Sequence, residues 1–261
     1  MVNIPKIALE LVLILSVFLV FKKEHVPINM KFVWMFTGIT ILLNISFYYL
    51  AAFSLYQDYG QSVGQSDTQI HLLIWFDILK WGIMAFVFVR YAVALQESNI
   101  ISSFQILSVP RPALLNVVIW GVGGGIMVTI VAYGLTAIAV QIGIFEGSPW
   151  PFFASSDTYK ALGLWGGVRN LFGEEILSRL GVQLLVMYLL RKHRFQVLLA
   201  IVISSLFFEF WHNGFKELYF LNFSASVVFA TAYYYKGYEA AAISHCTADW
   251  LIIVLIPRLF F

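Results

Sequence analysis

The sequence has few charged residues and no stretch polar enough to form a soluble domain. Only 11% of its 261 residues are Asp, Glu, Lys or Arg, whereas a typical soluble domain has about 25%. Hydrophobic residues make up 61% of the chain, and the mean hydropathy is +0.84. A soluble fold cannot cover this much apolar surface, so the sequence predicts a protein that crosses the membrane several times.

Cysteine is nearly absent as well. The single residue, Cys246, excludes an internal disulfide and a zinc cluster built from cysteines. The formal net charge is only +2, and we expect no nucleic-acid partner. The first 21 residues are apolar but have no small-residue cleavage site, so we interpret them as a retained membrane span rather than a signal peptide.

Apolar runs of about 20 residues, long enough to cross a bilayer, follow one another along the chain. Because backbone groups in lipid must be satisfied internally, the predicted fold class is all-α: one polytopic membrane bundle over 1–261, with about eight transmembrane helices. Residues 4–145 form its N-terminal helices, and residues 160–258 contain most of its polar motifs. The expected helices lie near residues 4–21, 32–56, 69–95, 113–145, 160–190, 195–212, 217–236 and 239–258.

Basic residues are distributed unevenly between the two sides of the membrane. The first, third, fifth and seventh connections contain eight of them: Lys22, Lys23, Lys31, Arg111, Arg191, Lys192, Arg194 and Lys236. The opposite side contains four: Lys6, Lys160, Lys216 and Arg258. Since cytoplasmic loops are enriched in Lys and Arg, we predict a multi-pass cell-membrane protein with cytoplasmic odd-numbered connections and both termini outside.

Several ionisable residues lie within the apolar runs. Each costs about 2.5–3.5 kcal/mol at bilayer depth on insertion scales, and such groups usually face a cavity or a partner. Asp77 and Lys80, three residues apart on one helix face, are interpreted as neutralising each other. Glu10 is expected near a helix end, where its charge reaches the interface. Gly121 and Gly125, four apart, predict close helix packing.

Three later segments each place polar or aromatic residues four positions apart, on one helix face. In GEEILSRL, which begins at Gly173, the pair is Glu175 and Arg179, while Glu174 is rotated by about 100°. The other two pairs are Phe208 with His212 and His245 with Asp249. We expect the three segments to converge on one polar cavity inside the membrane, because a free carboxylate and two histidines are equipped for proton transfer.

The order Glu-Glu-x-x-x-Arg, Phe-x-x-x-His and His-x-x-x-Asn/Asp resembles the motifs of the CAAX protease and bacteriocin-processing family of intramembrane endopeptidases. The resemblance covers about residues 160–258. It implies that a glutamate and a histidine activate water, and that a second histidine and its partner stabilise the oxyanion. The implied catalytic residues are Glu174, His212, His245 and Asp249, and the implied supporting residues are Glu175, Arg179 and Phe208.

The implied activity is a membrane endopeptidase that acts on a peptide or a lipidated protein within the lipid bilayer, for example by removing the C-terminal tripeptide of prenylated CAAX proteins. A non-catalytic immunity or scaffold protein of the same family stays open as the alternative. A small proton-coupled transporter is less favoured, because the sequence shows no internal repeat.

Asp249 stands where asparagine is frequent in the family. An ionised aspartate cannot donate a hydrogen bond to an oxyanion, although it can orient His245 or bind a metal ion. Two mechanisms therefore stay open. We favour the metal-free one, in which no cofactor is needed; in the other, a zinc ion is held by Glu174, His212, His245 and Asp249.

The depth of the motifs raises a further question. At about 1.5 Å per helical residue, Glu174 and His212 lie about 25 Å from the connection at 191–194, but His245 lies only about 10 Å from the turn at 235–239. Either that turn is recessed, or the helices tilt strongly, or the helix boundaries differ from those expected.

Overall fold

A computed structural model describes residues 4–21, 28–101, 103–104, 114–143, 165–213 and 220–255. Within these ranges all regular secondary structure is helical, which confirms the predicted fold class. The N-terminal elements are α1 (Ile4–Phe21), α2 (Met30–Ser46), the π-helical segment η1 (Phe47–Ala52), α3 (Phe53–Ser62) and α4 (Asp67–Glu97). They are followed by α5 (Leu114–Gln141), helical residues 165–171, η2 (Ile176–Gln183), α7 (Leu184–Leu189), α8 (Gln196–Asn213), α9 (Phe220–Asp249) and η3 (Trp250–Leu255).

The described residues form eight successive helical segments, and the expected ranges agree with them to within a few residues. The largest difference is in the second segment, which continues through η1 and α3 to Ser62. The seventh and eighth meet inside α9, where Gly237 has φ 80° and ψ −178° and breaks the helix. Glycine adopts this φ without steric cost. The expected helical residues 144–145, 160–164, 217–219 and 256–258 lie outside the described residues.

The long helix α4 begins at a clear sequence signal. Ser66 Oγ accepts a hydrogen bond from the Gln69 backbone N–H at 3.3 Å, and Gln69 Oε1 accepts one from the Ser66 N–H at 2.8 Å. This reciprocal capping satisfies two backbone donors that the first helical turn leaves free. It fixes the residue at which α4 starts.

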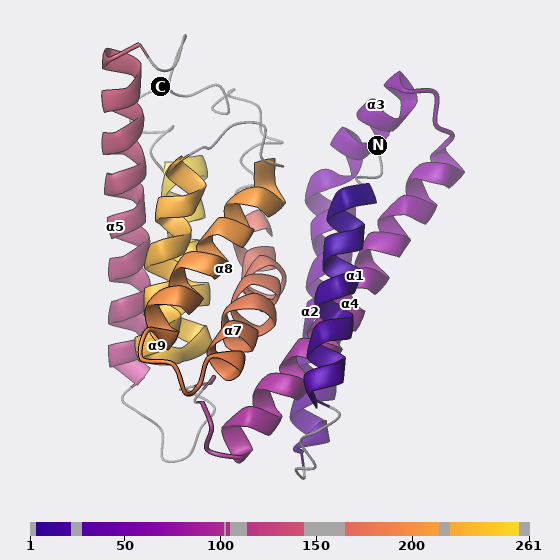
Figure 1. The fold of residues 1–261 in the computed structure, drawn as a ribbon. Helices are drawn as coiled ribbons and strands as arrows, with labels where there is room; N and C mark the ends of the chain where they lie inside the picture. Colours follow the sequence, from indigo (N-terminus) through magenta and orange to yellow (C-terminus); the bar gives the residue numbers. More distant parts are fainter. Residues whose placement is uncertain are drawn as a thin grey trace.

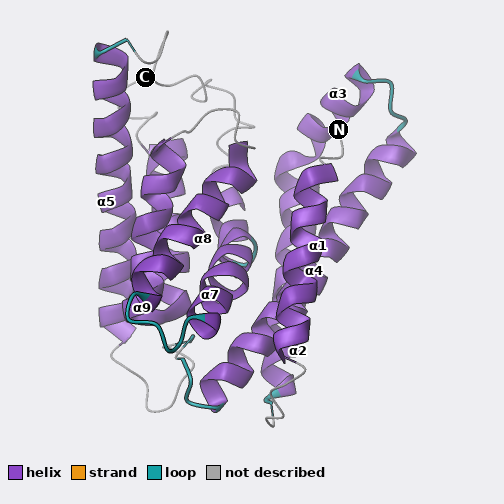
Figure 2. Cartoon of the chain, viewed as in Figure 1, coloured by secondary structure: helices purple, strands orange, loops and turns teal. Residues whose placement is uncertain are grey.

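The helices are arranged in two groups (Figure 1), with α1–α4 on one side and α5 and α7–α9 on the other. Figure 2, in the same view, shows the connections at the ends of the helices. One buried cluster joins the groups, with Leu13 of α1 and Phe88 of α4 packed with Leu180 of η2. Gly181 allows this approach, because a Cβ there would lie only 3.1 Å from both Leu13 and Phe88.

The predicted glycine seam lies between α5 and α9. A Cβ on Gly121 would lie 2.6 Å from the Ile243 side chain, and one on Gly125 would lie 2.5 Å from Thr247. Both distances are far shorter than a van der Waals contact. The two backbones can therefore pack this closely only because these positions lack side chains.

Apolar side chains face outward as well as inward. The segments Met30–Leu50, Asp67–Glu97 and Leu114–Val131 are long and apolar enough to cross a membrane, and Gln196–His212 is a shorter apolar helix. A contiguous exposed apolar surface is unfavourable in water, so this surface is expected to face lipid, and the chain is a multi-helix membrane protein. The exposed residues include Leu11, Leu15 and Phe18 of α1, Leu72 and Leu79 of α4, and Leu115 and Ile130 of α5.

The turn at Gly237 answers the question of depth. Tyr238, directly after it, is only 3% exposed. Its backbone N–H donates to the Ser103 carbonyl at 2.8 Å, and its hydroxyl donates to the Leu171 carbonyl. These contacts tie the turn to Ser103 and to the helical residues 165–171. His245 Nε2 lies 3.9 Å from Glu174 Oε2, so the two groups are at the same level although His245 follows the turn closely in the chain.

Candidate active site

Glu174 and His212 form the polar pair that faces the cavity. Glu174 Oε2 lies 3.1 Å from His212 Nε2, and the two side chains are 12% and 27% exposed. His212 Nδ1 lies 2.8 Å from the carbonyl oxygen of Phe208, one turn earlier in α8. Because a carbonyl only accepts, Nδ1 carries a proton. The contact between Nε2 and the carboxylate then holds one further proton, bound to either His212 or Glu174.

His245 is held on the opposite side of Glu174. Its Nδ1 donates to Glu175 Oε1 at 2.8 Å, so its Nε2 is directed toward the other two carboxylates, 3.9 Å from Glu174 Oε2 and 3.6 Å from Asp249 Oδ2. The imidazole stacks on Phe229, with ring centres 4.6 Å apart. The carboxylate and the stacked ring together fix the orientation of the imidazole.

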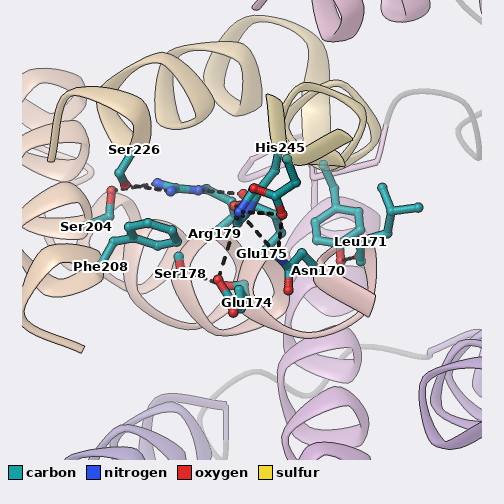
Figure 3. A network of polar contacts seen from close by, with 12 residues as sticks. Asn170, Leu171, Glu174, Glu175, Ser178, Arg179, Ser204, Phe208, Ser226 and His245 are labelled. Carbon is teal, nitrogen blue, oxygen red and sulfur yellow. Dashed lines mark hydrogen bonds and ion pairs between the residues drawn. The ribbon is translucent and has the colours of Figure 1, made fainter. Parts of the chain in front are cut away.

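The predicted pair of Glu175 and Arg179 is confirmed. Arg179 Nε donates to Glu175 Oε2 at 2.8 Å, and both side chains are fully buried. Arg179 also donates to Ser226 Oγ of α9 at 2.7 Å and to Ser204 Oγ of α8 at 3.2 Å. Figure 3 shows the guanidinium reaching from Glu175 to these two serines. Since the other oxygen of Glu175 holds His245, this network positions three helical segments around the site.

Phe208 lies among the charged groups rather than at the cavity centre. Its ring centre is 4.2 Å from that of His212 and 5.7 Å from that of His245, and the Arg179 Cζ atom lies 5.9 Å from it. It therefore packs both histidines and the arginine, which fits the supporting position that the resemblance implies.

Asn170 also belongs to this cluster, although the sequence patterns did not single it out. Its Nδ2 donates to Asp249 Oδ2 at 2.7 Å and lies 3.5 Å from His245 Nε2. The available signal was an amide four positions before Glu174 in an apolar segment. Asn170 provides a neutral N–H donor directly beside Asp249, which has none when ionised.

Residues 157–251 match the family model described as type II CAAX prenyl endopeptidase Rce1-like. In this region, which is less than half of the chain, the sequence is similar to the CAAX protease family. The match contains all three motifs and confirms the resemblance seen in the sequence. It also identifies the family as one of proteases. No curated protein and no solved structure gives a significant match.

Helices outside the Rce1-like region complete the site. A cavity of about 490 Å³ adjoins Glu174 and His212. Part of its wall comes from α1, η1, α3 and α4, which contribute Lys6, Tyr48, Tyr56, Asp77, Lys80 and Trp81, and residues 165–171 contribute Arg169. The first half of the chain therefore supplies much of the surface that a substrate of the Rce1-like region would meet.

The residues at and near this wall confirm the expected pairing of Asp77 with Lys80 but contradict the expected position of Glu10. Asp77 and Lys80 form the predicted pair at 2.7 Å. Glu10, however, is 1% exposed and does not extend to the interface as expected. It accepts a hydrogen bond from Trp211 Nε1 at 2.9 Å and lies 3.3 Å from Lys80 Nζ. Because both partners belong to other helices, no spacing within α1 could indicate them.

The four residues that the zinc mechanism would use lie close together. Among the described residues, no group of three or more His, Cys, Asp or Glu side chains is placed to hold a metal. The four candidate ligands do cluster, but His212 Nε2 is engaged with Glu174 and Asp249 Oδ2 with Asn170. The zinc mechanism stays an alternative, and substitution of Asp249 tests it.

Proposed function

We propose that the chain is an intramembrane endopeptidase in which Glu174 and His212 act together as the general base. The observation that carries this proposal is their 3.1 Å contact at the wall of a cavity large enough for a peptide segment. The base removes a proton from water while the water oxygen bonds to the peptide carbonyl carbon. The same proton then passes to the leaving nitrogen, the C–N bond breaks, and the base is restored.

Charge that develops on the carbonyl oxygen needs donors directed toward it. The Nε2 atom of His245 is directed toward Glu174, at 3.9 Å from its Oε2, because Glu175 holds Nδ1. The Asn170 amide lies beside it and offers a second, neutral donor. Asp249 anchors that amide at 2.7 Å. We assign His245 and Asn170 to the oxyanion, Asp249 to the placement of both, and Glu175 and Arg179 to the placement of His245.

The proposed substrates are peptides or lipidated proteins held at the bilayer, with prenylated CAAX proteins as the class suggested by the family description. The cavity wall includes apolar and aromatic side chains such as Trp81, Trp211 and Ile74. It also reaches Gln65, in the turn between α3 and α4. The uneven distribution of basic residues predicts that this end of the bundle lies outside the cytoplasm. The side of the membrane on which it lies decides which substrates can enter the cavity.

Mass spectrometry of peptides incubated with the purified protein tests this function. We expect the wild type to release a C-terminal fragment from a farnesylated CAAX peptide, and Glu174→Ala to reduce the rate by about 10²–10⁴-fold, the range for loss of a general base. The variant should still insert and fold. Near-normal turnover by Glu174→Ala would refute the role of this residue, and absence of cleavage by the wild type across lipidated and unlipidated peptides would favour the non-catalytic alternative.

A further inference from the structure

A buried tyrosine of α9 contacts the segment that contains Asn170, at a point that the three motifs do not include. Tyr238 is 3% exposed, and its hydroxyl donates to the backbone carbonyl of Leu171. Leu171 is the last of the helical residues 165–171, and the final carbonyls of a helix have no partner within it. The hydroxyl therefore binds an acceptor at the point where this helical segment ends.

Tyr238 shares a helix face with two groups of the proposed oxyanion site. It begins the second half of α9, directly after the break at Gly237. His245 and Asp249 follow it by seven and eleven positions, and both spacings return to the same face of an α-helix. This half of α9 thus holds the three side chains in a fixed relation to one another.

Residues 165–171 lie against this half of α9. A Cβ on Gly167 would lie 3.7 Å from the Cβ of Asp249, so the two backbones are close. The Asn170 amide donates to the same Asp249 at 2.7 Å. The next residue, Leu171, lies at the edge of the polar cluster (Figure 3) and contacts Tyr238, about three helical turns before Asp249. The segment is therefore attached to α9 at two levels, and Asn170 lies between Gly167 and Leu171.

We propose that Tyr238 is a positioning residue for the Asn170 amide. This inference rests on the proposed function, in which that amide and His245 donate to the oxyanion. Because Tyr238 and His245 belong to the same half of α9, the bond to Leu171 sets the distance between the two donors. Such donors act only when they are directed at the position that the oxyanion takes, and a misplacement of about 1 Å can lower the rate about 100-fold.

Tyr238→Phe tests the proposal, because it removes the hydroxyl alone. The ring keeps its packing with Phe36 and Phe104, whose ring centres both lie 5.7 Å away, so the variant should fold. We expect kcat for the farnesylated CAAX peptide to fall about tenfold, less than for loss of the amide itself. KM should stay unchanged, because the hydroxyl binds a backbone carbonyl rather than the substrate.

Tyr233→Phe is the matched control. Tyr233 is also buried in α9, at 1% exposed, and among the described residues its hydroxyl does not bond to the segment 165–171. This variant should keep the wild-type kcat.

Two further measurements separate positioning from a general loss of structure. In an Asn170→Ala background, Tyr238→Phe should have little further effect on kcat, because no amide is left to position. Hydrogen–deuterium exchange of residues 165–174, which needs no substrate, should be faster in Tyr238→Phe than in the wild type or in Tyr233→Phe.

The outcomes distinguish this inference from the proposed function. An unchanged kcat in Tyr238→Phe, beside an active wild type, would overturn the positioning role and leave the endopeptidase proposal intact. Unchanged exchange, an equal loss in the Asn170→Ala background, or a loss shared by Tyr233→Phe would also overturn it. No cleavage of any peptide by the wild type would refute both proposals.

Discussion

The polar cluster around Arg179 and the one around Lys80 both place charges among apolar helices, but one is closed and the other is open. Arg179 and Glu175 are fully buried, and their donors and acceptors are used by each other, by serines and by His245. Lys80 and Asp77 are 18% and 27% exposed and lie on the cavity wall. A closed network fixes geometry, whereas an open one keeps donors available to a ligand.

The two clusters also differ in how the chain builds them. The closed one combines local pairs at four-residue spacing with contacts between helices inside the Rce1-like region. The open one joins residues as far apart as Glu10 and Trp211, which are separated by 201 positions. The geometry of the proposed catalytic groups therefore follows mainly from the matched region, while the wall of the cavity depends on the whole bundle.

The contrast predicts unequal costs of removing a cation. Arg179→Ala should lower the free energy of unfolding by about 3–5 kcal/mol, because it leaves a buried carboxylate unpaired. Lys80→Ala should cost less, since Asp77 keeps its contacts with Tyr48, Trp81 and Arg169, and the buried Glu10 keeps its hydrogen bond from Trp211. Thermal unfolding in detergent, followed for both variants beside the wild type, measures the difference. Equal melting temperatures for the two variants would remove the distinction between closed and open clusters.

Asn170 gives a sharper test of the proposed mechanism, because it lies beside the closed cluster, in contact with His245 and Asp249. Asn170→Ala should lower kcat by about 100-fold, as expected for loss of one oxyanion donor, while KM and the melting temperature change little. Steady-state kinetics with the farnesylated peptide measures kcat and KM separately. The same substitution in an Asp249→Asn background should cost much less, because position 249 then supplies the missing amide. An equal loss in both backgrounds would contradict this assignment.

A smaller effect is expected for Asp249→Asn alone. The change keeps the shape of the side chain and adds a neutral donor beside His245, so activity should survive or rise, and chelators should have little effect. If zinc is used, the substitution removes an anionic oxygen ligand, and metal content and activity should fall together. Activity assays with a chelator and with added zinc, combined with measured metal content, decide between the two mechanisms.

The last prediction concerns which side of the membrane each connection faces, and its substitutions should leave activity unchanged. In a Cys246→Ser background, an impermeant thiol reagent applied to intact cells should label a cysteine placed at Ser62 and miss one placed at His193. The opposite pattern would invert the topology. It would also place the Gln65 end of the cavity in the cytoplasm, where lipidated cytoplasmic proteins could reach it.

Much of this architecture could be predicted because its signals are local. Apolar runs indicate the helices, and four-residue spacing indicates the pair of Glu175 and Arg179. The same spacing also indicates the faces that bear His212 and His245. The position of the turn at Gly237 stayed open, because it depends on contacts with Ser103 and Leu171 rather than on the residues of the turn alone.

What could not be predicted depends on contacts between helices. Glu10 was assigned to a helix end because nothing near it in the chain indicates Trp211 or Lys80. Asn170 and Arg169 were not singled out, because a single amide or arginine is not a motif. Their neighbours Asp249 and Asp77 come from helices about 80 or more positions away in the chain.

The π-helical segment η2 determines how the site responds to a change in chain length. It runs from Ile176 to Gln183, directly after the two glutamates, and at its end the Leu184 N–H donates to the Arg179 carbonyl, five positions back. Such a turn accommodates one residue more than an α-helical turn. If the same residues adopted α-helical geometry with none removed, the following helix would be rotated by up to about 100°, and Tyr188 would turn out of the core. Deleting one residue between Leu180 and Gln183 would instead remove the wide turn and keep the following helix near its present orientation. A single-residue deletion should therefore be tolerated better in this turn than in an α-helical turn of α8.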